Sequence, residues 1–170
     1  MKQKKLIASV LVGNTMEFYD FIVFAFMSKQ ISALFFPNAD ILVSYISTFA
    51  VFASGYLMRP IGGLFFGYIG DKYGRKVSLS YSVLIITVST FFIGLLPTYQ
   101  YAGILAPVLL TLCRLLQGFS VSGEQGGAAV YLSEMVGSNK LAYSGSMVLG
   151  SAYFGVLLGS ATCLILNLTF

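Results

Sequence analysis

The feature that most constrains this chain is a series of five apolar runs, each long enough to cross a lipid bilayer. A membrane-spanning helix needs about 20 mostly apolar residues. The runs are separated by short gaps and lie at about 10–34, 43–69, 77–96, 102–124 and 142–166. We therefore predict an all-α integral membrane protein with five transmembrane helices.

The composition excludes several classes of protein. Of the 170 residues, 57% are hydrophobic and only 9% are charged, whereas a typical soluble domain has about 25% charged residues. This argues against a soluble globular protein, a disordered chain and a nucleic-acid binder. The chain has no His, which rules out a Ser-His-Asp triad, a Cys-His dyad and a His-based metal site. We predict that it is not an enzyme and needs no metal or organic cofactor.

The basic residues predict how the chain is oriented. The gaps at 37–40 and 97–101 contain no Lys or Arg, and Lys29 lies near that face. Because Lys and Arg are enriched in cytoplasmic segments, the N-terminus is predicted to lie in the cytoplasm. The opposite face holds most of the basic residues: Lys2, Lys4, Lys5, Lys72, Arg75, Lys76 and Lys140.

Two acidic residues lie in the first predicted span. Glu17 and Asp20 are three positions apart and therefore share one helical face. Charges inside a bilayer usually face a bundle interior or a water-filled path. Desolvation and mutual repulsion let one of the two carboxyls carry a proton near neutral pH, as a proton-coupled carrier requires. The alternative is a structural pair held by a cation from another helix.

Three further charges fall within or at the ends of other spans. Arg114 is a natural partner for the acidic face, for an anionic group of a substrate, or for a permanent structural ion pair. Glu124, at the cytoplasmic end of the same span, is either a second proton site or an interfacial end residue. Arg59 precedes Pro60 and is predicted to have a structural role, its side chain reaching toward the cytoplasm.

A glycine-rich loop separates the second and third spans. It contains Gly67, Gly70, Asp71, Lys72, Tyr73, Gly74, Arg75 and Lys76. Gly74 permits a tight turn with positive φ, and Asp71 can cap the next helix. Glycines four residues apart also predict close helix packing, because they let helix backbones approach one another in lipid. These pairs are Gly63 and Gly67, Gly123 and Gly127, and Gly155 and Gly159.

Several motifs in order resemble the major facilitator superfamily. The segment 67–76 resembles its signature loop between helices two and three, and 114–118 resembles its fourth-helix motif. The segments 13–21, 59–63 and 117–124 narrow the resemblance to the metabolite:proton symporter family. Within that family, the segments 63–67 and 70–75 most resemble members that transport proline and betaine.

The resemblance implies a function and a set of site residues. It implies a symporter that carries small zwitterionic osmolytes or organic acids together with protons, by alternating access, in a bacterial inner membrane. A central cavity would hold Glu17, Asp20, Arg114 and Glu124. A cytoplasmic gate would hold Gly67, Asp71, Gly74, Arg75 and Lys76, with Arg59 supporting it.

The number of helices predicts how the chain relates to such transporters. They have twelve helices in two halves, with the substrate site between the halves. Residues 1–170 would form most of the N-terminal six-helix domain, and we expect no transport by this chain alone. One alternative is a split transporter, in which a second polypeptide supplies the remaining helices. Another is a non-transporting membrane protein that binds a full-length relative.

Overall fold

The computed structural model describes residues 2–37, 40–136 and 141–169, without the side chains of 2–6, 9, 124–131, 133–136 and 141. Every regular element in these ranges is a helix. In chain order they are α1 (Lys2–Phe26), α2 (Ser28–Phe35), α3 (Ile41–Tyr73), α4 (Arg75–Leu95), α5 (Tyr99–Ala102), α6 (Leu105–Val136) and α7 (Leu141–Thr169).

Four of these helices are long and apolar enough to cross a membrane: α3, α4, α6 and α7. The first predicted span is not one straight helix, because Val10–Phe26 and Ser28–Phe35 meet at an angle of 66°. Counted together, this bent pair gives a fifth span. The structure therefore confirms the predicted all-α membrane fold.

The bend after α1 has a reason in the packing. It brings Phe35 of α2 into a buried cluster with Phe24, Val51 and Leu110. The packing of Phe35 in this cluster favours a turn over a continuous helix, because helix association in lipid depends on close packing contacts. The expectation of an unbroken helix over 10–34 was wrong because this long-range contact cannot be read from local periodicity.

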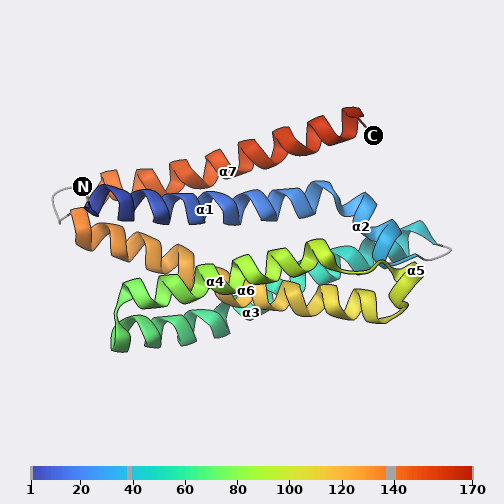
Figure 1. The fold of residues 1–170 in the computed structure, drawn as a ribbon, viewed down its shortest axis with the longest axis horizontal. Coiled ribbons are helices and arrows are strands. Elements are labelled where there is room, and N and C mark those ends of the chain that lie inside the picture. The colour runs from blue at the N-terminus through green and yellow to red at the C-terminus, as the bar shows by residue number, and fades with distance from the viewer. Residues whose placement is uncertain (1, 38–39, 137–140, 170) are drawn as a thin grey trace.

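The helices form two layers, shown in Figure 1. Helices α1 and α7 lie side by side in one layer, and α3, α4 and α6 form the other. The N-terminus and the turn between α3 and α4 lie at one end of the molecule. Helix α5, the start of α3 and the end of α7 lie at the other end.

Glycines set the contact between α3 and α6. A side chain at Gly118 would meet the carbonyl of Gly55, and one at Gly62 would meet the carbonyl of Phe119. The predicted contact through Gly67 was wrong, because a Cβ there would have nothing within 4 Å. A Cβ at Gly63 would lie 3.9 Å from Ser122 Cβ of α6, in ordinary contact, and the closer approach is at the neighbouring Gly62.

The other two glycine pairs fare differently. Gly155 and Gly159 of α7 pack against α1, at the carbonyls of Thr15 and Tyr19, as predicted. Gly123 packs on the ring of Phe66, while the surroundings of Gly127 lie outside the described residues.

The fourth apolar run also has boundaries other than 102–124. Gly103 adopts a positive φ of 56° and separates α5 from α6, which begins at Leu105. Helix α6 then continues to Val136, well beyond the predicted end of the fourth span at 124. Helix length and membrane-spanning length are therefore different quantities in this chain.

Candidate functional site

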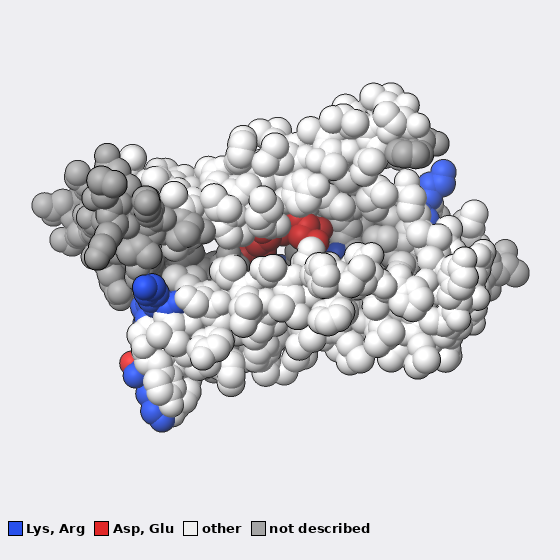
Figure 2. Space-filling view, in the orientation of Figure 1, with Lys and Arg blue, Asp and Glu red and all other residues white. Residues whose placement is uncertain are grey.

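A cavity lies between the two helical layers, near the middle of the molecule. Its volume is about 20 Å³, room for about one water molecule. Figure 2 shows acidic side chains in the hollow between the layers. The lining comes from α1, α3, α4 and α6: Glu17, Asp20, Phe21, Phe52, Gly55, Ile86, Arg114, Gln117, Gly118 and Val121.

Helical spacing explains why these side chains meet. Residues three, four and seven positions apart share one face of a helix. On α1 this spacing joins Glu17, Asp20 and Phe21, and on α6 it joins Arg114, Gln117, Gly118 and Val121. Each helix thus contributes one narrow polar face, and the rest of its surface is free to contact lipid or neighbouring helices.

An ion pair joins the two layers across the cavity. Arg114 Nη1 of α6 lies 3.5 Å from Asp20 Oδ2 of α1, and the Arg114 side chain is 96% buried, with 4% of its surface exposed. The guanidinium carbon also lies 3.5 Å from the ring centroid of Phe24 and 5.9 Å from that of Phe52. An aromatic face attracts a cation, so these rings help to hold the buried charge.

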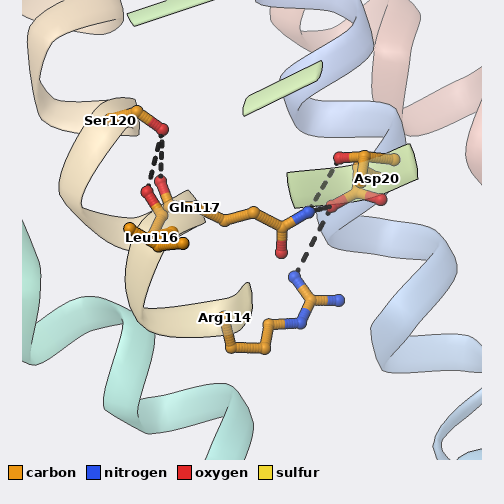
Figure 3. A network of polar contacts seen from close by, with 6 residues as sticks. Asp20, Arg114, Leu116, Gln117 and Ser120 are labelled. Carbon is orange, nitrogen blue, oxygen red and sulfur yellow. Dashed lines mark hydrogen bonds and ion pairs between the residues drawn. The ribbon is translucent and has the colours of Figure 1, made fainter. Parts of the chain in front are cut away.

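The amide of Gln117 completes the polar network, drawn in Figure 3. Its Nε2 donates to Asp20 Oδ2 at 2.9 Å and to Thr90 Oγ1 of α4 at 2.8 Å. Asp20 therefore contacts two side chains of α6 at the same oxygen, and the amide extends the network to α4. Gln117 is buried, with 5% of its surface exposed.

The structure brings together three of the four predicted cavity residues. Glu17, Asp20 and Arg114 all line the same cavity, and Glu17 is 5% exposed. The side chain of Glu124 lies outside the described residues, so its place in the cavity stays a prediction.

The guanidinium of Arg59 lies against two aromatic rings beside the cavity. Its guanidinium carbon is 4.3 Å from the ring centroid of Tyr56 and 5.2 Å from that of Phe21. It thereby bridges α3 and α1, and Phe21 is also part of the cavity wall. The structure places Arg59 at these rings rather than at the turn between α3 and α4, so its support of a gate stays a prediction.

The predicted loop at 67–76 is a turn of one residue. Gly74, with φ of 96°, stands between α3 and α4, as its predicted freedom to adopt positive φ requires. Asp71 does not cap α4. It lies in the last turn of α3 and pairs with Arg75 at 2.7 Å. Lys76 is exposed in the first turn of α4.

Gly70 adds a contact that the sequence did not single out. A Cβ at this position would lie 3.0 Å from a terminal nitrogen of Arg75. The bare backbone at Gly70 therefore gives the Arg75 guanidinium room to reach Asp71. The role of this turn in a cytoplasmic gate stays a prediction.

Sequence reasoning missed several residues of the site. Phe21, Phe52 and Ile86 line the cavity, while Phe24 and Thr90 contact Arg114 and Gln117. Phe21 and Phe24 lie one and four positions after Asp20 on α1, and this spacing was the available sequence signal for these two residues. Nothing in the sequence marks Thr90, because Thr is common in membrane helices and its partner is 27 residues away.

Spanning helices with buried charges around an internal cavity are typical of membrane transport proteins. The model of the sugar (and other) transporter family matches residues 6–170. The chain belongs to this family, within the major facilitator superfamily.

Curated relatives narrow the similarity. The proline/betaine transporter of Salmonella typhimurium is 42% identical over 166 residues, which are 98% of this chain and 33% of that protein. The glycine betaine/proline/ectoine/pipecolic acid transporter OusA of Dickeya dadantii is 40% identical, over 96% of this chain and 33% of the relative. A putative proline/betaine transporter of Staphylococcus aureus is 49% identical, over 78% of this chain and 29% of that protein.

The chain thus spans about a third of the length of these relatives, and it matches their N-terminal part. No solved structure matches the chain.

Proposed function

We propose that the chain is the N-terminal bundle of a proton-coupled symporter for small zwitterions such as proline and betaine. The observation that carries the proposal is the Asp20–Arg114 pair, which faces an internal cavity in a chain of this family. The names of the relatives support the substrate class.

Each partner of the pair has a proposed role. Asp20, with Glu17 beside it in the cavity wall, takes up and releases the coupling proton. Arg114 keeps its charge at any physiological pH and binds the carboxylate of the zwitterion once Asp20 is protonated. No other cofactor is needed in this scheme.

The size of the cavity adds a requirement. A volume of about 20 Å³ holds one water and not a zwitterion of several heavy atoms. The space for a substrate must therefore be completed by helices beyond this chain. Alternating access, in which one half of the transporter rocks against the other, opens and closes such a space.

The remaining helices of the relatives are part of the proposal. The chain corresponds to a third of their length, and substrate sites in such transporters lie between two halves. We propose that this chain alone does not transport, and that a second polypeptide carrying the other helices restores uptake.

Sidedness in the bacterial inner membrane is proposed from charge. Lys72, Arg75 and Lys76 lie at the end of the molecule that holds the turn between α3 and α4, and Figure 2 shows basic side chains gathered there. At the opposite end, Lys29 is the basic residue that the described part of the chain provides. This asymmetry favours a cytoplasmic N-terminus.

The proposal is tested by uptake in bacteria that lack their own proline and betaine carriers. The chain is expressed alone and together with the C-terminal two-thirds of the Salmonella relative. We expect no uptake alone and protonophore-sensitive uptake of labelled betaine or proline with the partner, lost in D20N and R114Q. S120A, a buried change one turn from Gln117, is the matched control. Uptake that persists in D20N or with protonophore would contradict proton coupling through Asp20.

A further inference from the structure

The side-chain amide of Gln117 on α6 forms hydrogen bonds with two other helices. Gln117 Nε2 donates to the Asp20 carboxylate of α1 and to the Thr90 hydroxyl of α4. Its other atom, Oε1, is buried without a hydrogen-bond partner in the described part of the chain. Figure 3 shows the amide between the Asp20 carboxylate and the backbone of α6.

The protonation state of Asp20 changes which hydrogen bonds its carboxyl can form with this amide. A carboxylate only accepts hydrogen bonds, so the donor nitrogen of Gln117 must face it. A protonated carboxyl has one O–H to donate, and it then needs an acceptor. An unpaired buried acceptor is costly, and among the described residues Gln117 Oε1 is such an acceptor, on the same amide whose nitrogen contacts Asp20.

We propose that Gln117 is a positioning residue that transmits the protonation of Asp20 to α4. When a proton from water binds Asp20, the Gln117 side-chain amide turns by half a rotation. Oε1 then accepts hydrogen bonds from both the Asp20 carboxyl and the Thr90 hydroxyl. The inference rests on the proposed role of Asp20 as the proton site and adds a defined responder to it.

The surrounding charges determine what the turn accomplishes. From α1, Glu17 lines the same cavity, and from α6, Arg114 pairs with Asp20. From α3, Arg59 lies one ring away, over Phe21. Helix α4 contributes Ile86 and Thr90, neither of which ionises near neutral pH. Protonation of Asp20 removes the counter-charge of Arg114, so the amide turn and the release of Arg114 occur together.

The test follows the amide itself in the wild-type chain, in lipid nanodiscs. Side-chain amides are labelled with ¹⁵N-glutamine, and the Gln117 signals are assigned by their loss in Q117L. The protonation of Asp20 is followed in parallel by ¹³C-aspartate labelling in a D40N and D71N background, which leaves Asp20 as the chain's remaining aspartate. We expect both Gln117 amide proton shifts to change with pH at the same midpoint as the Asp20 carboxyl.

Two variants sharpen the result. D20N keeps the shape of the side chain and cannot titrate, so the Gln117 signals should become independent of pH. S120A removes a buried hydroxyl of the same helix that donates to the backbone carbonyls of Leu116 and Gln117, and it should leave the response unchanged.

The outcomes separate this inference from the proposed function. Gln117 signals that stay constant while Asp20 titrates overturn the amide turn and leave Asp20 standing as the proton site. A pH response of Gln117 that persists in D20N also overturns it. An Asp20 that keeps one protonation state wherever the chain stays folded overturns the inference and the proton site together.

Discussion

At the scale of single residues, the buried guanidinium of Arg114 is held by an unusual balance of contacts. Its distance of 3.5 Å from Asp20 is longer than the 2.7–2.9 Å typical of charge-assisted hydrogen bonds, while the Phe24 ring lies directly against it. A guanidinium that is held partly by aromatic faces depends less on the negative charge of its carboxylate partner. Such an arrangement suits a carboxylate that changes charge during a working cycle.

The D20N substitution tests how much Arg114 depends on its partner. Removing one member of a buried ion pair leaves the other charge uncompensated, and we expect D20N to lower the free energy of unfolding by about 3 kcal/mol. D20N combined with R114M removes both charges, and it should recover most of that loss. Reversible unfolding in mixed micelles, followed by circular dichroism, measures both. Equal losses in the single and double variants would contradict an energetic pairing.

Gly118 supplies a second prediction at this scale, because it touches the backbone of Gly55. A methyl group at Gly118 would meet the Gly55 carbonyl, so G118A should destabilise the bundle by about 1–3 kcal/mol. G67A is the matched control: its Cβ meets nothing within 4 Å, and Ala favours a helix over Gly by up to about 1 kcal/mol. The same unfolding assay compares them. A G118A variant as stable as G67A would refute the close approach of α3 and α6.

The sequence predicted the charged part of the site and not the rest. Glu17, Asp20 and Arg114 stood out because ionisable residues are rare in spanning helices. Phe24 and Thr90 did not, because membrane helices are full of aromatic residues and threonines, and only the fold decides which ones face inward. The same limit explains why Gly63 was favoured over Gly62, since a shift of one residue rotates a helix by about 100°.

At the scale of helices, the chain shows where local patterns fail. Apolar runs predicted the spans, but the break between α1 and α2 depends on Phe35 reaching a cluster formed with α3 and α6. The turn at Gly74 was predictable because it depends on one residue's backbone freedom. Elements fixed by local chemistry can be read from sequence, whereas those fixed by distant contacts cannot.

Helix α7 is tied to α1 by both polar and close contacts. Asn14 Nδ2 donates to the Val148 carbonyl at 2.9 Å and to Ser151 Oγ at 2.8 Å, and Gly155 packs on the Thr15 carbonyl. Hydrogen bonds between membrane helices contribute about 0.6 kcal/mol on average. Close packing at Gly155 must therefore carry much of this contact.

G155V should loosen α7 without disturbing the other layer. The larger side chain displaces α7 from α1, so amide hydrogen exchange should rise in both helices and stay unchanged in α3 and α6. G150V is the control on the same helix, because a Cβ at Gly150 has nothing within 4 Å. Exchange that rises throughout the chain would show instead that the two layers unfold as one unit.

At the scale of the whole molecule, contacts within each layer are more extensive than contacts between the two layers. Contacts are extensive within each layer, between α1 and α7 and between α3 and α6, and sparse between α1 and α4. The network of Asp20, Arg114 and Gln117 joins the two layers across the cavity, and Arg59 over the ring of Phe21 joins them beside it. These polar groups thus lie where the two layers meet.

Sidedness is the prediction that belongs to the whole chain. In a C113A and C163A background, a cysteine at Lys76 should react with a membrane-impermeant maleimide only after bacterial spheroplasts are permeabilised. A cysteine at Tyr101, which is 86% exposed in the structure and lies near the opposite end, should react in intact spheroplasts. The physical reason is that the positive charge of Lys72 and Arg75, which stay when Lys76 is replaced by Cys, holds their turn on the cytoplasmic side.

Removing that charge provides the decisive comparison. With Lys72 and Arg75 replaced by Gln, the cysteine at position 76 should become partly accessible from outside, because the charge difference between the two faces falls. The control is Q100A, beside Tyr101, because this substitution changes no charge. Gln replacements within the spanning helices are not used as the control, since they would test stability rather than sidedness. If the cysteine at position 76 is labelled in intact spheroplasts while Lys72 and Arg75 are still present, the topology is the opposite of the predicted one. The proposed gate would then lie outside the cell.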